Sequence, residues 1–252
     1  MKIKRCLLAS AASLLPFAAN AADLPVKAPL PAPPPPAFTW TGLYLGASAG
    51  FITQGTTFTD VGTATSPSFG LFAEIPGETL GINGAGGIFG FDIGYNYQIG
   101  PWVLGVEADI SGTTLNNSTS ALAFGEFPSS ISSKLPGLAT LRGRVGYAFD
   151  RLLIYATGGF AAGTVSNTVS VSGLPAAFSA ATGDWQTTGW TVGGGIEYAF
   201  TYNWILRLEG LYVDLGSVTA TNNPEPSHPQ SNCRFGFKNT YALGRGGVEY
   251  KF

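Results

Sequence analysis

From Phe38 onward, apolar residues alternate with small or polar ones in a series of short segments. In residues 43–51, for example, every odd position is apolar, and the even positions are small or polar apart from Tyr44. A period of two predicts β-strands with one apolar face. The alternating segments are 43–51, 89–97, 102–110, 141–147, 190–198, 204–209 and 248–252. One further segment, 152–162, is apolar on both faces. The pattern therefore predicts eight strands and an all-β fold.

The connections between these segments alternate in length. Residues 99–101, 150–151 and 201–203 are short and contain Gly, Pro, Asp or Asn, which predicts tight hairpin turns. The other connections are long and rich in Ser, Thr, Asn and Gly, and we expect them to be loops: 52–84, 112–134, 163–186 and 216–237. Short turns at one end and long loops at the other are typical of bacterial outer-membrane barrels.

Aromatic residues gather near both ends of the predicted strands. Those beside the short turns are Trp40, Tyr97, Trp102, Phe149, Phe200, Tyr202, Trp204, Tyr250 and Phe252, and those beside the long loops are Phe51, Phe160, Trp185, Trp190 and Tyr212. Two aromatic girdles are expected at the two interfaces of a membrane. The sequence thus predicts an eight-stranded antiparallel up-and-down transmembrane β-barrel over residues 38–252.

Charge is scarce in this chain, at 11% of residues, whereas ordinary soluble domains have about 25%. The net charge of -2 offers no electrostatic footprint for nucleic acid, and the apolar content excludes intrinsic disorder. Eleven charged residues, six acidic and five basic, lie within the predicted strands on the face opposite the large apolar side chains. These residues are Asp92, Glu107, Asp109, Arg142, Arg144, Glu197, Arg207, Glu209, Arg245, Glu249 and Lys251. We expect them to line the barrel interior and to pair with one another, because unpaired charges there would be prohibitive.

A soluble barrel of the lipocalin type would show the same alternation, with the charges facing water. The alternation alone does not distinguish the two, and the aromatic girdles favour the membrane barrel. The first residues point to export as well. Residues 1–21 combine a basic start, an apolar stretch and the Ala19-Asn20-Ala21 cleavage pattern, which predicts a signal peptide. Residues 22–37 contain a run of prolines and are expected to form an extended periplasmic linker.

Several segments together resemble a known family. Residues 22–27 and the proline run, followed by 40–46, are similar to the start of the small alphaproteobacterial outer-membrane β-barrel proteins, which include major surface immunogens, proteins labelled as porins, and hemin-binding members. Later similar segments are 141–147, 155–159, 189–193 and 211–216. The resemblance implies a location in the outer membrane, with both termini in the periplasm. It also implies that the terminal Phe252 is the signal read by the outer-membrane assembly machinery.

No catalytic, cofactor or metal site is predicted. Gly46-Ala47-Ser48-Ala49-Gly50 has the spacing of a serine nucleophile elbow but lies inside a predicted strand, and the single histidine, His228, belongs to a distant loop. Residues 84–90 have Phe89 where a dinucleotide-binding motif requires its third glycine. The exported chain has one histidine, His228, and one cysteine, Cys233, which are too few for a zinc or iron site. The same two residues are the ordinary candidates for axial ligands of hemin.

The leading hypothesis is a non-enzymatic barrel that contributes to envelope integrity and displays surface loops, surrounded by membrane lipid and lipopolysaccharide. An alternative is a small porin-like channel for ions or polar solutes, lined by the interior charges. An eight-stranded barrel is just wide enough for its own side chains, which favours a salt-bridged plug. Loops on a rigid scaffold commonly carry recognition, so the long loops are candidates for binding an extracellular ligand.

Overall fold

The computed structural model describes residues 38–63, 79–123, 126–173, 179–181, 185–221 and 233–252. The predicted signal peptide and linker, residues 1–37, lie outside this part of the chain. Among the described residues, no helix is long and apolar enough to cross a membrane.

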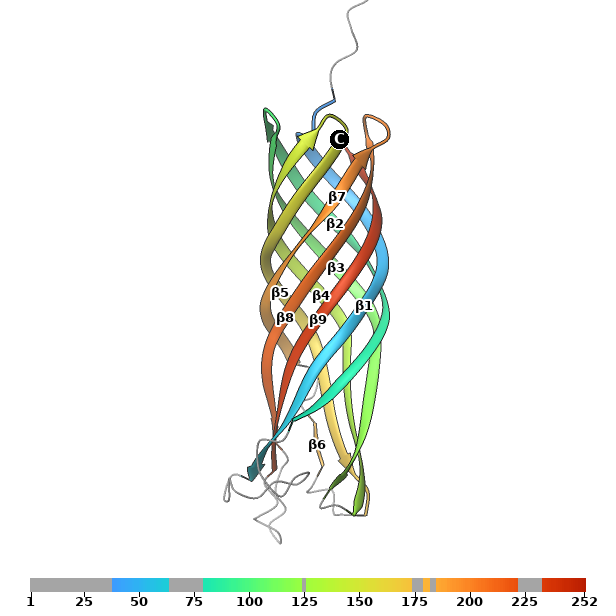
Figure 1. The fold of residues 1–252 in the computed structure, drawn as a ribbon, viewed down its shortest axis with the longest axis vertical. Helices are drawn as coiled ribbons and strands as arrows, with labels where there is room; N and C mark the ends of the chain where they lie inside the picture. The colour runs from blue at the N-terminus through green and yellow to red at the C-terminus, as the bar shows by residue number, and fades with distance from the viewer. Residues whose placement is uncertain (1–37, 64–78, 124–125, 174–178, 182–184, 222–232) are drawn as a thin grey trace, which may run out of the picture. The chain divides into compact units, whose positions relative to one another are not determined.

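Eight long strands form one ring, in which every strand pairs antiparallel with its neighbours and β1 pairs with β9 (Figure 1). They are β1 (Gly42–Thr63), β2 (Thr79–Ile99), β3 (Trp102–Ala123), β4 (Phe127–Phe149), β5 (Leu152–Val171), β7 (Trp185–Ala199), β8 (Trp204–Thr221) and β9 (Cys233–Lys251). The two-residue strand β6 (Ala180–Ala181) pairs with β5. This ring confirms the predicted eight-stranded up-and-down barrel.

The three predicted hairpin turns are present at one end of the ring, which is also the end where β9 finishes (Figure 1). Between β2 and β3, Gly100 has a φ of 59° and is followed by Pro101. Between β4 and β5, Asp150 takes up the left-handed conformation with a φ of 55°. A positive φ at the first turn position matches the right-handed twist of the paired strands, and Gly and Asp are among the residues that tolerate it.

At the other end, the prediction of long loops is wrong over much of their length. The strands β1 to β4 have 22, 21, 22 and 23 residues, whereas about 9–11 residues suffice for a tilted strand to cross a membrane. The expected loop 112–134 is almost entirely strand, since β3 and β4 stay paired as far as Ala123 and Phe127. The barrel therefore continues as a β-sheet well beyond the length needed to cross a membrane, and we call this part, which begins at Thr53 on β1, the extension.

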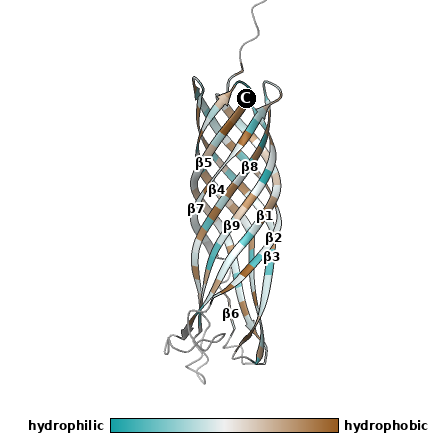
Figure 2. Cartoon of the chain, viewed as in Figure 1, coloured by the Kyte–Doolittle hydropathy of each residue, from teal (hydrophilic) through white to brown (hydrophobic). Residues whose placement is uncertain are grey.

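The chemistry of the two strand faces reverses where the extension begins. On β1, the outward residues Leu43, Leu45 and Phe51 are apolar, and the next ones, Thr53 and Thr57, are polar and exposed. The inner face changes from a network of charged residues to mainly apolar residues with buried polar ones between them, such as Gln54 and Thr56. Along the strands, apolar and polar positions alternate on both sides of this boundary (Figure 2). One end of the barrel thus has the apolar outward face of a membrane barrel, and the extension has the polar outward face of a soluble barrel.

This reversal gives a direct test of where the membrane lies. Leu208 is 61% exposed on β8, midway between the girdle residues Trp204 and Tyr212. Arg at this position should lower the free energy of unfolding by about 2–4 kcal/mol, because it would face hydrocarbon. Arg at Thr57, which is also outward but in the extension, should change it by less than about 0.5 kcal/mol. Urea titrations of the barrel in lipid vesicles measure both, and equal effects would contradict this boundary.

Candidate functional site

The barrel interior gathers the charged residues that the sequence singles out. The structure buries all eleven, Asp92, Glu107, Asp109, Arg142, Arg144, Glu197, Arg207, Glu209, Arg245, Glu249 and Lys251. Ten of them, all except Lys251, form a connected set of ion pairs, which we call the ionic network. Period two places these residues on the inner face, and closure of the ring brings opposite walls within ion-pair distance.

Glu107, on β3, is the hub of the ionic network. Its Oε1 pairs with Arg142 Nη2, and its Oε2 lies 3.2 Å from Arg144 Nη1 and 2.6 Å from Arg207 Nη1. Tyr44 also donates a hydrogen bond to Oε2, at 2.7 Å. A buried carboxylate is tolerated only when such partners compensate for its lost hydration. Glu107 therefore ties β3 to β1, β4 and β8 across the interior.

A second group of contacts is centred on Glu209 of β8. Arg142 Nη1 donates to Glu209 Oε1 at 2.8 Å, and Arg245 Nε donates to Glu209 Oε2 at 2.8 Å. Both arginines also pair with Asp109, at 3.2 Å for Arg142 Nη2 and 3.0 Å for Arg245 Nη1. Tyr155 completes the group by donating to Glu209 Oε1 at 2.9 Å. Shared acceptors of this kind make the network cooperative.

Two tyrosines in this site were not predicted from the sequence. Tyr44 and Tyr155 are buried, and the Arg144 guanidinium lies 5.5 Å and 4.1 Å from their ring centroids. Tyr44 is the exception to the alternation of residues 43–51. A tyrosine on the small, polar face must point into the barrel, so this exception predicts a tyrosine in the barrel interior.

The end of the barrel with the short turns is filled by apolar side chains, which we call the basal cluster: Trp40, Val103, Ala148, Leu153, Tyr155, Ala199 and Ile205, with Phe38 packed against them. The expectation that Trp40 belongs to an aromatic girdle is wrong, because Trp40 is fully buried. Its indole Nε1 donates to Asp150 O at 3.0 Å. Lys251 lies at this end, where its Nζ donates to Thr39 O and sits 4.3 Å from the Phe38 ring centroid.

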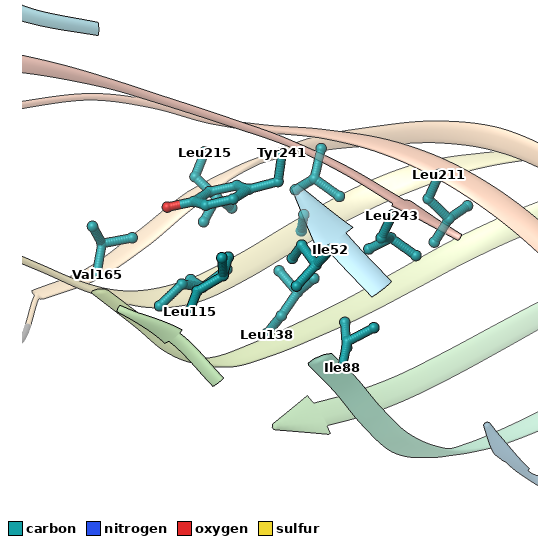
Figure 3. Close-up of a cluster of buried hydrophobic side chains, with 12 residues drawn as sticks. Ile52, Ile88, Leu115, Leu138, Val165, Leu211, Leu215, Tyr241 and Leu243 are labelled. Carbon is teal, nitrogen blue, oxygen red and sulfur yellow. The ribbon is translucent and has the colours of Figure 1, made fainter. Parts of the chain in front are cut away.

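On the other side of the ionic network the interior becomes apolar. The middle cluster consists of Ile52, Ile88, Leu115, Leu135, Leu138, Ala161, Val165, Leu211, Val213, Leu215, Tyr241 and Leu243. Side chains from opposite walls converge in it, among them Ile52 from β1, Leu138 from β4 and Leu243 from β9 (Figure 3).

Beyond the middle cluster, the extension has its own layered interior. Asn117 donates to Gln54 Oε1 at 3.0 Å, Gln54 donates to Thr56 Oγ1 at 2.8 Å, and Thr56 donates to Asn239 Oδ1 at 3.2 Å. A distal apolar cluster follows, made of Phe58, Ile82, Ala123, Ile131, Val169, Val171, Ala180, Ala220, Phe235 and Phe237. The interior thus alternates between apolar and polar layers along the barrel.

The remaining residues singled out from the sequence lie in strands, at the end of β9 or outside the described residues. Ser48 lies on the buried face of β1, and β1 continues past it as strand. Phe89 points outward from β2 and is exposed. Phe252 follows β9, is exposed, donates its backbone N–H to Leu43 O at 2.9 Å and packs edge-on against Tyr250. His228 and the side chain of Cys233 lie outside the part of the chain that the structure describes.

An apolar outer belt, a closed ring of strands and an interior of paired charges define a transmembrane β-barrel of the outer-membrane class. A family model described as outer membrane protein beta-barrel domain matches residues 7–238. The chain therefore belongs to the outer membrane β-barrel protein family and is located in the outer membrane, as the resemblance implies.

Relatives with a curated name support this assignment. The chain is 33% identical over 258 residues to the 31 kDa outer-membrane immunogenic protein of Brucella melitensis, covering 99% of this chain and 100% of the relative. It is 32% identical over 190 residues to the 22 kDa outer membrane protein of Rhizobium leguminosarum, covering 74% and 69%. Among solved structures, OprG of Pseudomonas aeruginosa superposes with a TM-score of 0.51 at 13% identity, covering 85% of this chain and 98% of OprG, which shows a shared fold.

Proposed function

We propose that this protein is a closed, non-enzymatic structural barrel, which contributes to envelope integrity and holds a surface-exposed β-extension and its loops above the membrane. The observation that carries the proposal is the layered interior, where the basal cluster, the ionic network, the middle cluster and the distal cluster follow one another along the barrel. Side chains from opposite walls meet in each layer, which disfavours a continuous water path.

The course of β9 illustrates this closure. From its last residues backward, its inner face presents Glu249 and Arg245 to the ionic network, then Leu243 and Tyr241 to the middle cluster, and then Phe237 to the distal cluster. A channel lined by the interior charges would need them to face water. Instead, the carboxylates and guanidinium groups of the network have side-chain exposures of 0–2%.

The names of the relatives support surface display. The Brucella relatives are named outer-membrane immunogenic proteins. In this chain, the extension lies at the end opposite the short turns, and outer-membrane barrels keep their short turns in the periplasm. We infer that the extension and its loops face the exterior, where an extracellular ligand or a host antibody would meet them, and that the outer-membrane assembly machinery inserts the barrel.

Planar-bilayer recording tests the closed interior. The purified full chain, inserted into the bilayer, should give no stable single-channel steps, and its insertion should be verified independently by protease protection in vesicles made from the same lipid. Reproducible steps from the pure protein would overturn the proposal in favour of the porin-like alternative. In cells, deletion of the chain should increase uptake of a detergent or large dye, and the wild-type chain should reverse that increase.

A further inference from the structure

The ionic network contains more negative than positive charge. Its carboxylates belong to Asp92, Glu107, Asp109, Glu197, Glu209 and Glu249, and its guanidinium groups belong to Arg142, Arg144, Arg207 and Arg245. With every group ionised, six carboxylates against four guanidinium groups leave a formal charge of -2. Uncompensated charge is costly in a buried interior, and it is removed either by protonation of a carboxylate or by binding of a positive counter-charge.

Three of the six carboxylates lie close together in the network. Asp92 of β2, Glu107 of β3 and Glu249 of β9 are all buried, and each offers a carboxylate oxygen within 4.8 Å of the other two. Oxygen ligands bind Ca²⁺ at about 2.3–2.6 Å, so two ligands of one ion lie at most about 5 Å apart. The three carboxylates are therefore close enough to share one ion.

Arg207 satisfies only one side of this carboxylate group. Its Nη2 lies 2.5 Å from Asp92 Oδ1, and its Nη1 lies 2.6 Å from Glu107 Oε2 and 2.8 Å from Glu249 Oε1. The remaining oxygens, Asp92 Oδ2 and Glu249 Oε2, are buried and have no hydrogen-bond partner among the residues that the structure describes. Glu249 Oε1 forms the ion pair with Arg207 but no hydrogen bond. Buried carboxylate oxygens without a partner are rare in folded proteins, and a bound cation would supply the missing partner.

The backbone between these two oxygens carries no side chain. Gly46 on β1 pairs with Asp92 on one side and with Glu249 on the other. A Cβ atom on Gly46 would lie 2.4 Å from Asp92 Oδ2, so the Asp92 carboxylate leans over the glycine. Glycine at this position thus lets the carboxylate of β2 approach the strand that lies next to β9.

We propose that the barrel interior encloses one small, hard divalent cation of the Ca²⁺ or Mg²⁺ class, bound by Asp92 and Glu249 beside Glu107. One such ion balances the formal charge of the network and occupies the two carboxylate oxygens that Arg207 leaves free. Because the surrounding side chains are almost fully buried, the ion is captured when the barrel closes.

The test is to refold the full chain from urea into detergent micelles, with Ca²⁺, with Mg²⁺ or with the chelator EDTA. Free metal is removed by gel filtration, and bound metal is measured by elemental mass spectrometry. The wild type should retain about one ion per chain, and the EDTA-folded barrel should unfold at a lower temperature on unboiled SDS gels. No metal above background, together with equal unfolding temperatures in Ca²⁺, Mg²⁺ and EDTA, would overturn the proposal.

Isosteric variants locate the ion. The double variant Asp92→Asn with Glu249→Gln should retain no metal, and its unfolding temperature should not respond to EDTA. Asp214→Asn is the control, because Asp214 lies on β8 outside the ionic network and its Oδ1 accepts a hydrogen bond from Gly216 N–H at 2.8 Å, and this variant should retain the ion. Equal metal content in the double variant and the control would refute the site.

If the double variant fails to fold, Glu249→Gln alone is compared with the wild type by Tb³⁺ luminescence. Tyr44, whose hydroxyl group is 2.7 Å from Glu107 Oε2, is placed to sensitise the ion. The wild type should show tyrosine-sensitised emission that Glu249→Gln loses. Emission of equal strength from both proteins would contradict binding by Glu249.

Discussion

Replacing Arg142 with Met is expected to destabilise the folded barrel by about 3–5 kcal/mol, because it removes one partner from each of several buried ion pairs. Arg142 donates to Glu209 at 2.8 Å and to Asp109 at 3.2 Å, and it also pairs with the hub, Glu107. Its Nε donates to Thr140 at 3.0 Å. Without the guanidinium group, the three carboxylates keep their burial and lose a shared counter-charge.

The measurement is a urea titration of the barrel in lipid vesicles, followed by tryptophan fluorescence and by the mobility of unboiled samples on SDS gels. Arg151→Met is the matched control. Arg151 lies at the short turn between β4 and β5, donates to Ala199 O at 3.4 Å and sits 5.1 Å from the Tyr202 ring centroid. Its replacement should cost about 1 kcal/mol or less. An Arg142→Met effect as small as that of Arg151→Met would mean that the network does not stabilise the barrel.

The face on which each interior charge lies could be predicted from the sequence, because period two is a local property. Glu107 and Arg207 both sit among large apolar residues that point the other way. Their pairing at 2.6 Å could not be predicted in this way, since it joins β3 to β8 across the closed ring and depends on how the strands are staggered. For the same reason, the carboxylate group of Asp92, Glu107 and Glu249 has no signature in the spacing of these residues along the chain.

The extension was not predicted from the sequence because its apolar residues point inward, whereas those of the membrane-spanning part point outward. Ile52 and Phe58 on β1 still alternate with Thr53 and Thr57, but here the apolar residues point inward. Many of the residues involved are Ser, Thr, Asn and Gly, which also favour turns and loops. A search for apolar outward positions therefore ends at the membrane boundary, while the hydrogen-bonded ladder continues to the distal cluster.

Trp40→Ala is the second large effect we expect, with a loss of about 3–5 kcal/mol in the free energy of unfolding. Trp40 is fully buried in the basal cluster, stacks edge-on with Phe38 at 5.1 Å between ring centroids and bonds to Asp150 O. Its removal leaves a cavity inside the barrel and an unpaired carbonyl group. Trp102→Ala is the control, because Trp102 faces lipid, which fills the vacated space. Both variants are compared by urea titration in vesicles. Both tryptophans lie near short turns in the sequence. Equal losses of stability would therefore contradict the burial of Trp40 and agree with a position in the aromatic girdle.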